Sequence, residues 1–296
     1  MSGNAAAWGQ YWRETSASGS GCASGAAGIT AACAKIWREF AAALPREAKV
    51  LDLATGNGAV LAHLGSVRAD LKLVGVDSAP DLGGAATGSD RLMAGVAMEA
   101  LPFEGASLDA VTSQFGFEYG ETPAIAREIA RVLRPGGSLR LVIHHADSPV
   151  VAQGRARREG LRWALAPGSP LEQAANFAAA RGLSSLPLPS ALRSAPSEAA
   201  RQFPGPSAAS EIMTGMIQVL ELGGPRAPEL LRQLRGKVAG ELARLDALIE
   251  AARSGEGAET VRGELQAAGL IVAAVEPRRE GATGPVFAWQ VDAKRS

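Results

Sequence analysis

Two aspartates and two glycines occupy positions where a chain can hold a nucleotide-like ligand. In "VLDLATGNGAV" (residues 50–60), Asp52 lies near the end of an apolar run, and Gly56 and Gly58 follow it. Asp77 ends the next apolar run, "LKLVGVD". A carboxylate at a strand end can accept hydrogen bonds from both hydroxyls of a ribose. Glycines between a strand and a helix allow a ligand to approach the backbone closely.

Two common glycine motifs do not fit this stretch. A phosphate-binding P-loop requires a lysine after its last glycine, and no lysine follows Gly58. A dinucleotide fingerprint requires a third small residue, and Leu61 stands there. The identity of the ligand therefore depends on the rest of the chain.

The elements that must position these residues alternate between strand and helix. Apolar runs predict strands over 49–54, 71–77, 91–98, 107–113 and 138–145. Helical spacing predicts helices over 29–44, 58–67 and 122–133, the last with Thr122 as N-cap and "RPGG" (134–137) as its stop. A helix over 258–269 and a hairpin of strands 270–277 and 285–293 close the chain. This rhythm predicts a doubly wound parallel sheet with ligands at the carboxyl ends of its strands.

Together these stretches resemble a class I S-adenosylmethionine-dependent methyltransferase, of the subgroup that includes ubiquinone and menaquinone methyltransferases. "VLDLATGNG", "LVGVDSAP", "ALPFEGASLDAVTS" and "LRPGGSLRLV" are similar to successive family motifs. The resemblance covers about 49–145 and 257–293. It implies an α/β, Rossmann-like, seven-stranded and mostly parallel sheet with a reversed last strand, plus a helical cap inserted after strand 5.

The resemblance also implies a division of the chain. Residues 1–48 would form an N-terminal lid and helices, 49–149 and 256–296 the donor-binding core, and 150–255 the helical cap over the acceptor site. A leucine-rich stripe within 227–255 indicates a long helix that packs inside the cap, with a homodimer helix as the alternative. The larger apolar residues of the cap indicate an apolar chamber or the cap's own core: Phe177, Phe203, Met213, Met216 and Leu220.

Carried over residue by residue, the resemblance implies a donor site for S-adenosylmethionine, with S-adenosylhomocysteine as the product. The loop against the methionine moiety would be Ala54, Thr55, Gly56 and Gly58, with Asp52 near the ammonium group and Gln114 and Phe115 near the methionine end. Asp77 would bind the ribose. Ser78, Met98 and Glu99 would lie around the adenine. Relatives often fold an N-terminal segment over the donor, which adds Tyr11 and Trp12, next to Trp8. Many relatives carry an acidic residue where this chain has Ala97, so its recognition of adenine differs.

Polar side chains after the fourth and fifth strands are the candidates for catalysis. An acceptor such as a phenol or enol requires a base, and the candidates are Glu118, Tyr119, His144 and His145. Because successive strand residues point to opposite faces, at most one of the two histidines enters the pocket, and we favour His145 because it lies further out. His63, on the first helix after the glycines, is expected to be structural.

The expected function is methyl transfer to a small, hydrophobic or aromatic acceptor, as in secondary or quinone metabolism. The alternatives are methylation of a peptide or other macromolecule, and a donor-binding protein with another activity. The formal net charge is zero, and "SQFGFEY" is not the motif that receives a flipped base, so nucleic acid is disfavoured.

Composition limits the remaining possibilities. Cys22 and Cys33 form neither a disulfide framework nor a zinc site, so we expect no metal and a reduced, cytoplasmic setting. The first residues lack the pattern of a signal peptide, and no apolar run reaches the ~20 residues of a membrane span.

Overall fold

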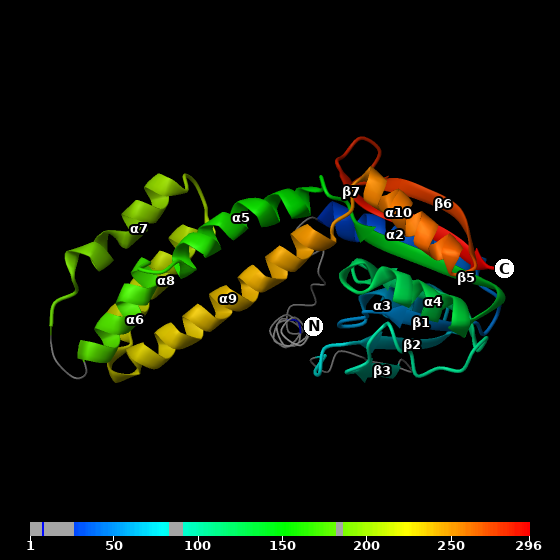
Figure 1. Ribbon diagram of the computed structural model, residues 1–296, viewed down its shortest axis with the longest axis horizontal. Coiled ribbons are helices and arrows are strands. Elements are labelled where there is room, and N and C mark those ends of the chain that lie inside the picture. Colours follow the sequence, from blue (N-terminus) through cyan, green and yellow to red (C-terminus); the bar gives the residue numbers. More distant parts are fainter. Residues whose placement is uncertain (1–7, 9–26, 83–90, 182–185) are drawn as a thin grey trace. The chain divides into compact units, whose positions relative to one another are not determined.

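The chain divides into two units in the computed structural model, which describes residue 8 and residues 27–82, 91–181 and 186–296 (Figure 1). One unit comprises Met1–Val151 together with Leu248–Ser296, and the other comprises Ala152–Ala247. The second unit is therefore an insertion into the first.

The first unit is built on a seven-stranded sheet with the order β3-β2-β1-β4-β5-β7-β6. Its strands are β1 (Lys49–Leu53), β2 (Lys72–Asp77), β3 (Arg91–Ala94), β4 (Leu108–Gln114), β5 (Leu133–His144), β6 (Leu270–Arg279) and β7 (Val286–Arg295). Strands β1 to β5 pair in parallel, whereas β7 is antiparallel to both β5 and β6. The expected Rossmann-like sheet with a reversed last strand is confirmed.

Helices cover both faces of this sheet (Figure 1). They are α2 (Ala27–Ala43), α3 (Ala59–Val67), the short η2 (Phe117–Tyr119), α4 (Thr122–Val132) and α10 (Gly255–Ala267). Strand residues alternate between the two layers, so Leu51 and Ile143 pack with α4 and α10, whereas Val50 and Val142 pack with α2 and α3. Central strands buried on both faces explain the continuous apolar runs of the sequence.

Two expected boundaries differ in the structure. The N-cap of α4 is Glu121 rather than Thr122, which is the first helical residue. Strand β5 begins at Leu133, before "RPGG", because Leu133 already pairs with Leu108 across an irregular register. The glycine turn after the helix therefore lies inside the strand, where Gly136 has a φ of 76°.

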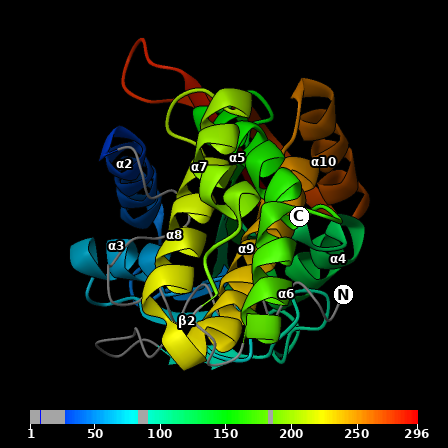
Figure 2. The ribbon, with the colours of Figure 1, turned by 90° about the vertical axis from the view of Figure 1, so that its left-hand side faces the viewer.

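The inserted unit is helical. It contains parts of α5 (Pro149–Leu165) and α9 (Ala227–Ala251), together with α6 (Pro170–Arg181), α7 (Ser190–Gln202), α8 (Ala208–Leu222) and η3 (Gly224–Arg226). Helices α7 and α8 pack side by side, and α6 contacts both (Figures 1 and 2). The apolar stripe of α9 packs into the core of this unit through Leu231, Leu234, Val238, Leu242 and Leu245. The larger apolar residues from the rest of the inserted unit belong to the same core: Phe177, Phe203, Met213, Met216 and Leu220.

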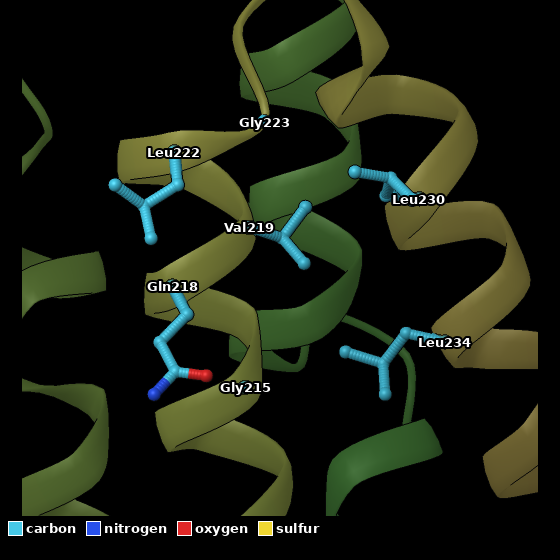
Figure 3. Close-up of a pocket in the computed structure, with 7 residues that line it drawn as sticks. All are labelled: Gly215, Gln218, Val219, Leu222, Gly223, Leu230 and Leu234. Atoms are coloured by element: carbon cyan, nitrogen blue, oxygen red, sulfur yellow. The ribbon is translucent and has the colours of Figure 1, made fainter.

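A hollow of about 370 Å³ lies at the turn between α8 and α9. Val219 of α8 faces Leu230 and Leu234 of α9 across this hollow (Figure 3). Gly215 also lines it, and a Cβ added there would meet no atom within 4 Å. Leu222, at the end of α8, is 85% exposed.

Among the described residues, no helix has the length and apolar character that crossing a bilayer requires.

Candidate active site

The candidate residues gather at one edge of the sheet because their strands are neighbours. The order β2-β1-β4-β5 is continuous, and these four strands run in parallel. The segments that follow Leu53, Asp77, Gln114 and His144 therefore emerge side by side. This is the edge at which open α/β sheets bind ligands.

The loop after β1 has the left-handed backbone that its glycines permit. Gly56 and Gly58 have φ values of 52° and 82°, and Ala54, a non-glycine residue, has a φ of 50°. Gly116, after β4, lies against this loop so closely that an added Cβ would stand 2.4 Å from the Ala54 Cβ. The loop is thus fixed in an unusual conformation, which is common at ligand-binding sites.

Asp77 ties the end of β2 to this loop. Its Oδ2 accepts a hydrogen bond from the Gly56 N–H at 2.9 Å, and its Oδ1 accepts one from the Ala79 N–H at 2.8 Å. Burial raises the pKa of this carboxyl, and the two backbone donors act against that rise. Each carboxylate oxygen can accept a further bond, so the side chain keeps capacity for the hydroxyls of a ligand.

Asp52 is more deeply buried, with an exposed fraction of 1%. Its Oδ1 accepts a hydrogen bond from the Thr112 hydroxyl of β4 at 2.8 Å. Burial raises the pKa of the Asp52 carboxyl to about 7, and the charge of Asp77 adds to the rise. A cationic group brought to this position would favour the ionised form and pull the pKa down again.

This shifted carboxyl predicts that donor affinity depends on pH. If Asp52 must ionise to hold an ammonium group, affinity should fall by up to about tenfold for each pH unit below 7, and donor binding at pH 6 should release a proton. Burial raises the pKa of Asp77 too, so its contribution has the same sign. Calorimetry in buffers of different ionisation enthalpy measures the released proton. Asp52→Asn should remove most of the pH dependence, and equal affinities at pH 6 and pH 8 would contradict the prediction.

Four further donor-site candidates have defined surroundings. Ser78 is exposed after β2, and Met98 and Glu99 are half-buried. The Glu99 Oε1 accepts a hydrogen bond from the Glu121 N–H at 3.1 Å. Gln114 is held from α2, because its Oε1 accepts a hydrogen bond from the Trp37 indole N–H at 2.7 Å. Tyr11 and Trp12 lie outside the described residues.

Glu118 and His144 form a buried pair between the ends of β4 and β5. The Glu118 Oε1 lies 2.8 Å from the His144 backbone N and 2.8 Å from its Nδ1. In the tautomer with its proton on Nδ1, the ring donates to this carboxylate oxygen and Nε2 has a lone pair. The Glu118 Oε2 is buried and has no hydrogen-bond partner among the described residues. This pair has the arrangement of a general base with its orienting carboxylate.

A row of aromatic rings surrounds His144. The Phe115 ring lies 4.3 Å from the imidazole, and the Tyr119 ring lies edge-on to it at 5.9 Å. Tyr119 in turn meets Trp8 edge-on at 5.7 Å, and Trp8 packs beside Ala79 just after β2. Phe115 has a φ of 55°, a strained conformation for a bulky residue. The base candidate is therefore enclosed by apolar rings.

The structure places the two histidines in different surroundings. His144 follows Val142 on the layer that contains Phe115, whereas His145 stacks on Trp289 of β7 with a ring separation of 4.9 Å. Burial lowers the pKa of His145, and its Nδ1 accepts a hydrogen bond from the Asp147 N–H. His144, and not His145, therefore lies with Glu118 and Tyr119.

Comparison with known proteins identifies the region that contains this edge. A model of a methyltransferase domain matches residues 51–141. Over these residues the chain is similar to a methyltransferase domain. The sequence resemblance to that family is thereby confirmed, and S-adenosylmethionine is the cofactor of this class of enzyme.

Two curated relatives each match about a third of this chain. A demethylmenaquinone methyltransferase from Corynebacterium kroppenstedtii is 40% identical over 107 residues, which are 35% of this chain and 44% of that protein. One from Deinococcus radiodurans is 38% identical over 119 residues, which are 36% of this chain and 48% of that protein. The chain thus spans less than half the length of these relatives. A solved S-adenosylmethionine-dependent methyltransferase from Aquifex aeolicus has 14% identity, covers 89% of each chain and has a TM-score of 0.45.

The residues of the methyltransferase domain fit this cofactor. Two buried carboxylates, Asp52 and Asp77, lie beside the left-handed loop, and carboxylates can accept hydrogen bonds from an ammonium group or from ribose hydroxyls. Sequence reasoning missed the side chains that hold these groups, Thr112 on Asp52 and Trp37 on Gln114. No sequence motif predicts these two contacts, because Thr112 bonds to Asp52 from a neighbouring strand and Trp37 bonds to Gln114 from helix α2.

Proposed function

We propose that this chain transfers a methyl group from S-adenosylmethionine to a small, hydrophobic or aromatic acceptor that loses a proton in the reaction. The observation that carries this proposal is the buried Glu118–His144 pair at the edge that also holds the donor loop. Such a pair is needed where the acceptor must be deprotonated, as in a phenol or an enol. The proposal includes a reduced, cytoplasmic setting.

Each part of the site has a task in this reaction. S-adenosylmethionine supplies an electrophilic methyl group on a sulfonium. Asp52, Asp77 and the loop at Gly56 hold the donor in place, which removes much of the entropic barrier. His144 accepts the proton of the acceptor at Nε2, and Glu118 stabilises the resulting imidazolium through Nδ1.

The surroundings of the base support an apolar acceptor of aromatic type. Phe115 and Tyr119 contact the His144 ring, and Trp8 contacts Tyr119; such rings stack on flat apolar molecules. Among the described residues no group donates to the Glu118 Oε2, which costs about 1–3 kcal/mol in a buried site, so a polar group of the acceptor could bind there. The curated relatives act on demethylmenaquinone by name, and a quinone-like acceptor fits this chemistry.

Two measurements test the proposal in sequence. Calorimetry with S-adenosylmethionine should show binding, and its absence would remove the proposed function altogether. Methyl-labelled donor is then incubated with the protein and cell extract, and the products are separated by size and identified by mass. We expect label in a small, organic-soluble product with wild-type protein and far less with His144→Ala in the same incubation time. Label in protein or nucleic acid would overturn the choice of acceptor.

A further inference from the structure

Arg253 connects the segments that surround the proposed base, although it lies far from them in sequence. The chain leaves β5 at His144 and enters α5 at Pro149, and it returns at the end of α9, at Ala251. The two linkers pair with each other, because His145 and Arg253 form a parallel bridge. The Arg253 N–H donates to the His144 carbonyl at 2.8 Å, and the Ala146 N–H donates to the Arg253 carbonyl at 2.9 Å.

The side chain of Arg253 reaches the other half of the pair. Its Nη2 donates to the backbone carbonyl of Glu118 at 3.2 Å, and its Nη1 donates to the Glu250 carbonyl at 3.3 Å. Glu118 lies in the short η2 turn, which α4 and β5 contact. A turn of three residues has few internal hydrogen bonds, so an external donor has a large share in fixing it.

The surroundings hold Arg253 in this position. The Trp289 indole N–H donates to the Arg253 carbonyl at 3.0 Å. Gly257, in the first turn of α10, leaves room for the aliphatic stem, because an added Cβ would stand 3.2 Å from the Arg253 Cδ. Trp289 therefore holds the Arg253 backbone, and Gly257 leaves space for its side chain to extend to Glu118.

We propose that Arg253 is a positioning residue for the Glu118–His144 pair, with its backbone fixing His144 and its guanidinium fixing Glu118. This inference rests on the proposed function, in which that pair is the base. Arg253 touches neither the ring of His144 nor the carboxylate of Glu118 in the contacts described. It acts by holding both backbones at the separation that the 2.8 Å contact between Oε1 and Nδ1 requires. Geometric errors of this kind are costly in catalysis.

The test removes the guanidinium and keeps the stem. Arg253→Met should lower kcat about tenfold, because a hydrogen bond from a charged donor is lost, and should leave the affinity for S-adenosylmethionine within about twofold. Arg253→Lys retains a charged donor and should recover most of the rate. Arg262→Met is the matched control, because Arg262 of α10 pairs only with Glu259 in the contacts described and should have no effect.

A double-mutant cycle separates positioning from a general loss of stability. In a His144→Ala background, Arg253→Met should cause no further loss of rate, because the residue acts through His144. A tenfold loss that persists in that background would overturn the inference.

A second readout does not depend on methyl transfer. The proton NMR resonance of the His144 imidazole N–H, assigned by its absence in His144→Ala, should be protected from solvent in wild type and in Arg253→Lys. It should exchange rapidly in Arg253→Met. An unchanged resonance in Arg253→Met would overturn the positioning role even if the wild type transferred no methyl group, and the absence of transfer alone would count against the proposed function only.

Discussion

Replacing His144 with alanine should lower kcat by roughly 10²- to 10⁴-fold, which is the range for loss of a general base. The affinity for S-adenosylmethionine should change little, since the Nδ1 of His144 faces Glu118 and no donor-loop group contacts the ring among the interactions described. Steady-state kinetics with the identified acceptor give kcat, and calorimetry gives the donor affinity. This split between rate and binding is the signature of a group that acts in the transition state.

The two other histidines are matched controls for this prediction. His63→Ala removes a half-buried histidine of α3 and should leave kcat unchanged. His145→Ala removes a ring stacked on Trp289 and should lower kcat far less than His144→Ala. If His145→Ala were the more damaging change, the assignment of the base would pass to His145.

Replacing Asp77 with alanine should weaken the binding of S-adenosylmethionine about 100-fold, since two hydrogen bonds to a charged group are worth about 3 kcal/mol. The change also removes the acceptor of the Gly56 N–H, so the loop itself loses an anchor. Calorimetry with the donor and with S-adenosylhomocysteine measures the effect. Both ligands carry the ribose and should lose affinity alike.

Asp109 provides the control for this second prediction. It lies at the opposite, amino end of β4, where its carboxylate pairs with Arg134 and accepts from the Lys49 N–H. Asp109→Ala should leave donor affinity within about twofold while lowering stability by about 1 kcal/mol or less, as for a partly exposed ion pair. Equal losses of donor affinity in the Asp77 and Asp109 variants would show that Asp77 acts only through folding.

The strand ends and the turn on the proposed donor side were accessible to sequence reasoning because their signals are local. Asp77 stands at the end of an apolar run, and the parallel sheet brings every such end to one edge. Gly56 and Gly58 stand where the backbone must turn with positive φ, which few other residues tolerate. Strand, turn and helix here lie within one short stretch, so the pattern of the sequence is sufficient.

The acceptor side depends on contacts that no local pattern records. Which histidine faces Phe115 follows from the phase of β5, and that phase depends on its pairing, with His144 opposite Ala288. Glu118 is aimed by a turn that follows β4, which strand periodicity does not describe. Arg253 reaches Glu118 across 135 positions of sequence.

The bridge between His145 and Arg253 also has a consequence for how such a chain can change over time. The chain segment before the inserted helices and the segment after them pair with each other within the sheet-based unit, so the insertion begins and ends at adjacent positions. A segment with adjoining ends can be lengthened, shortened or exchanged at little entropic cost to its host. The strand ends that carry Asp52 and Asp77 lie on β1 and β2, so we expect the helices after β5 to be exchangeable without loss of the proposed donor site.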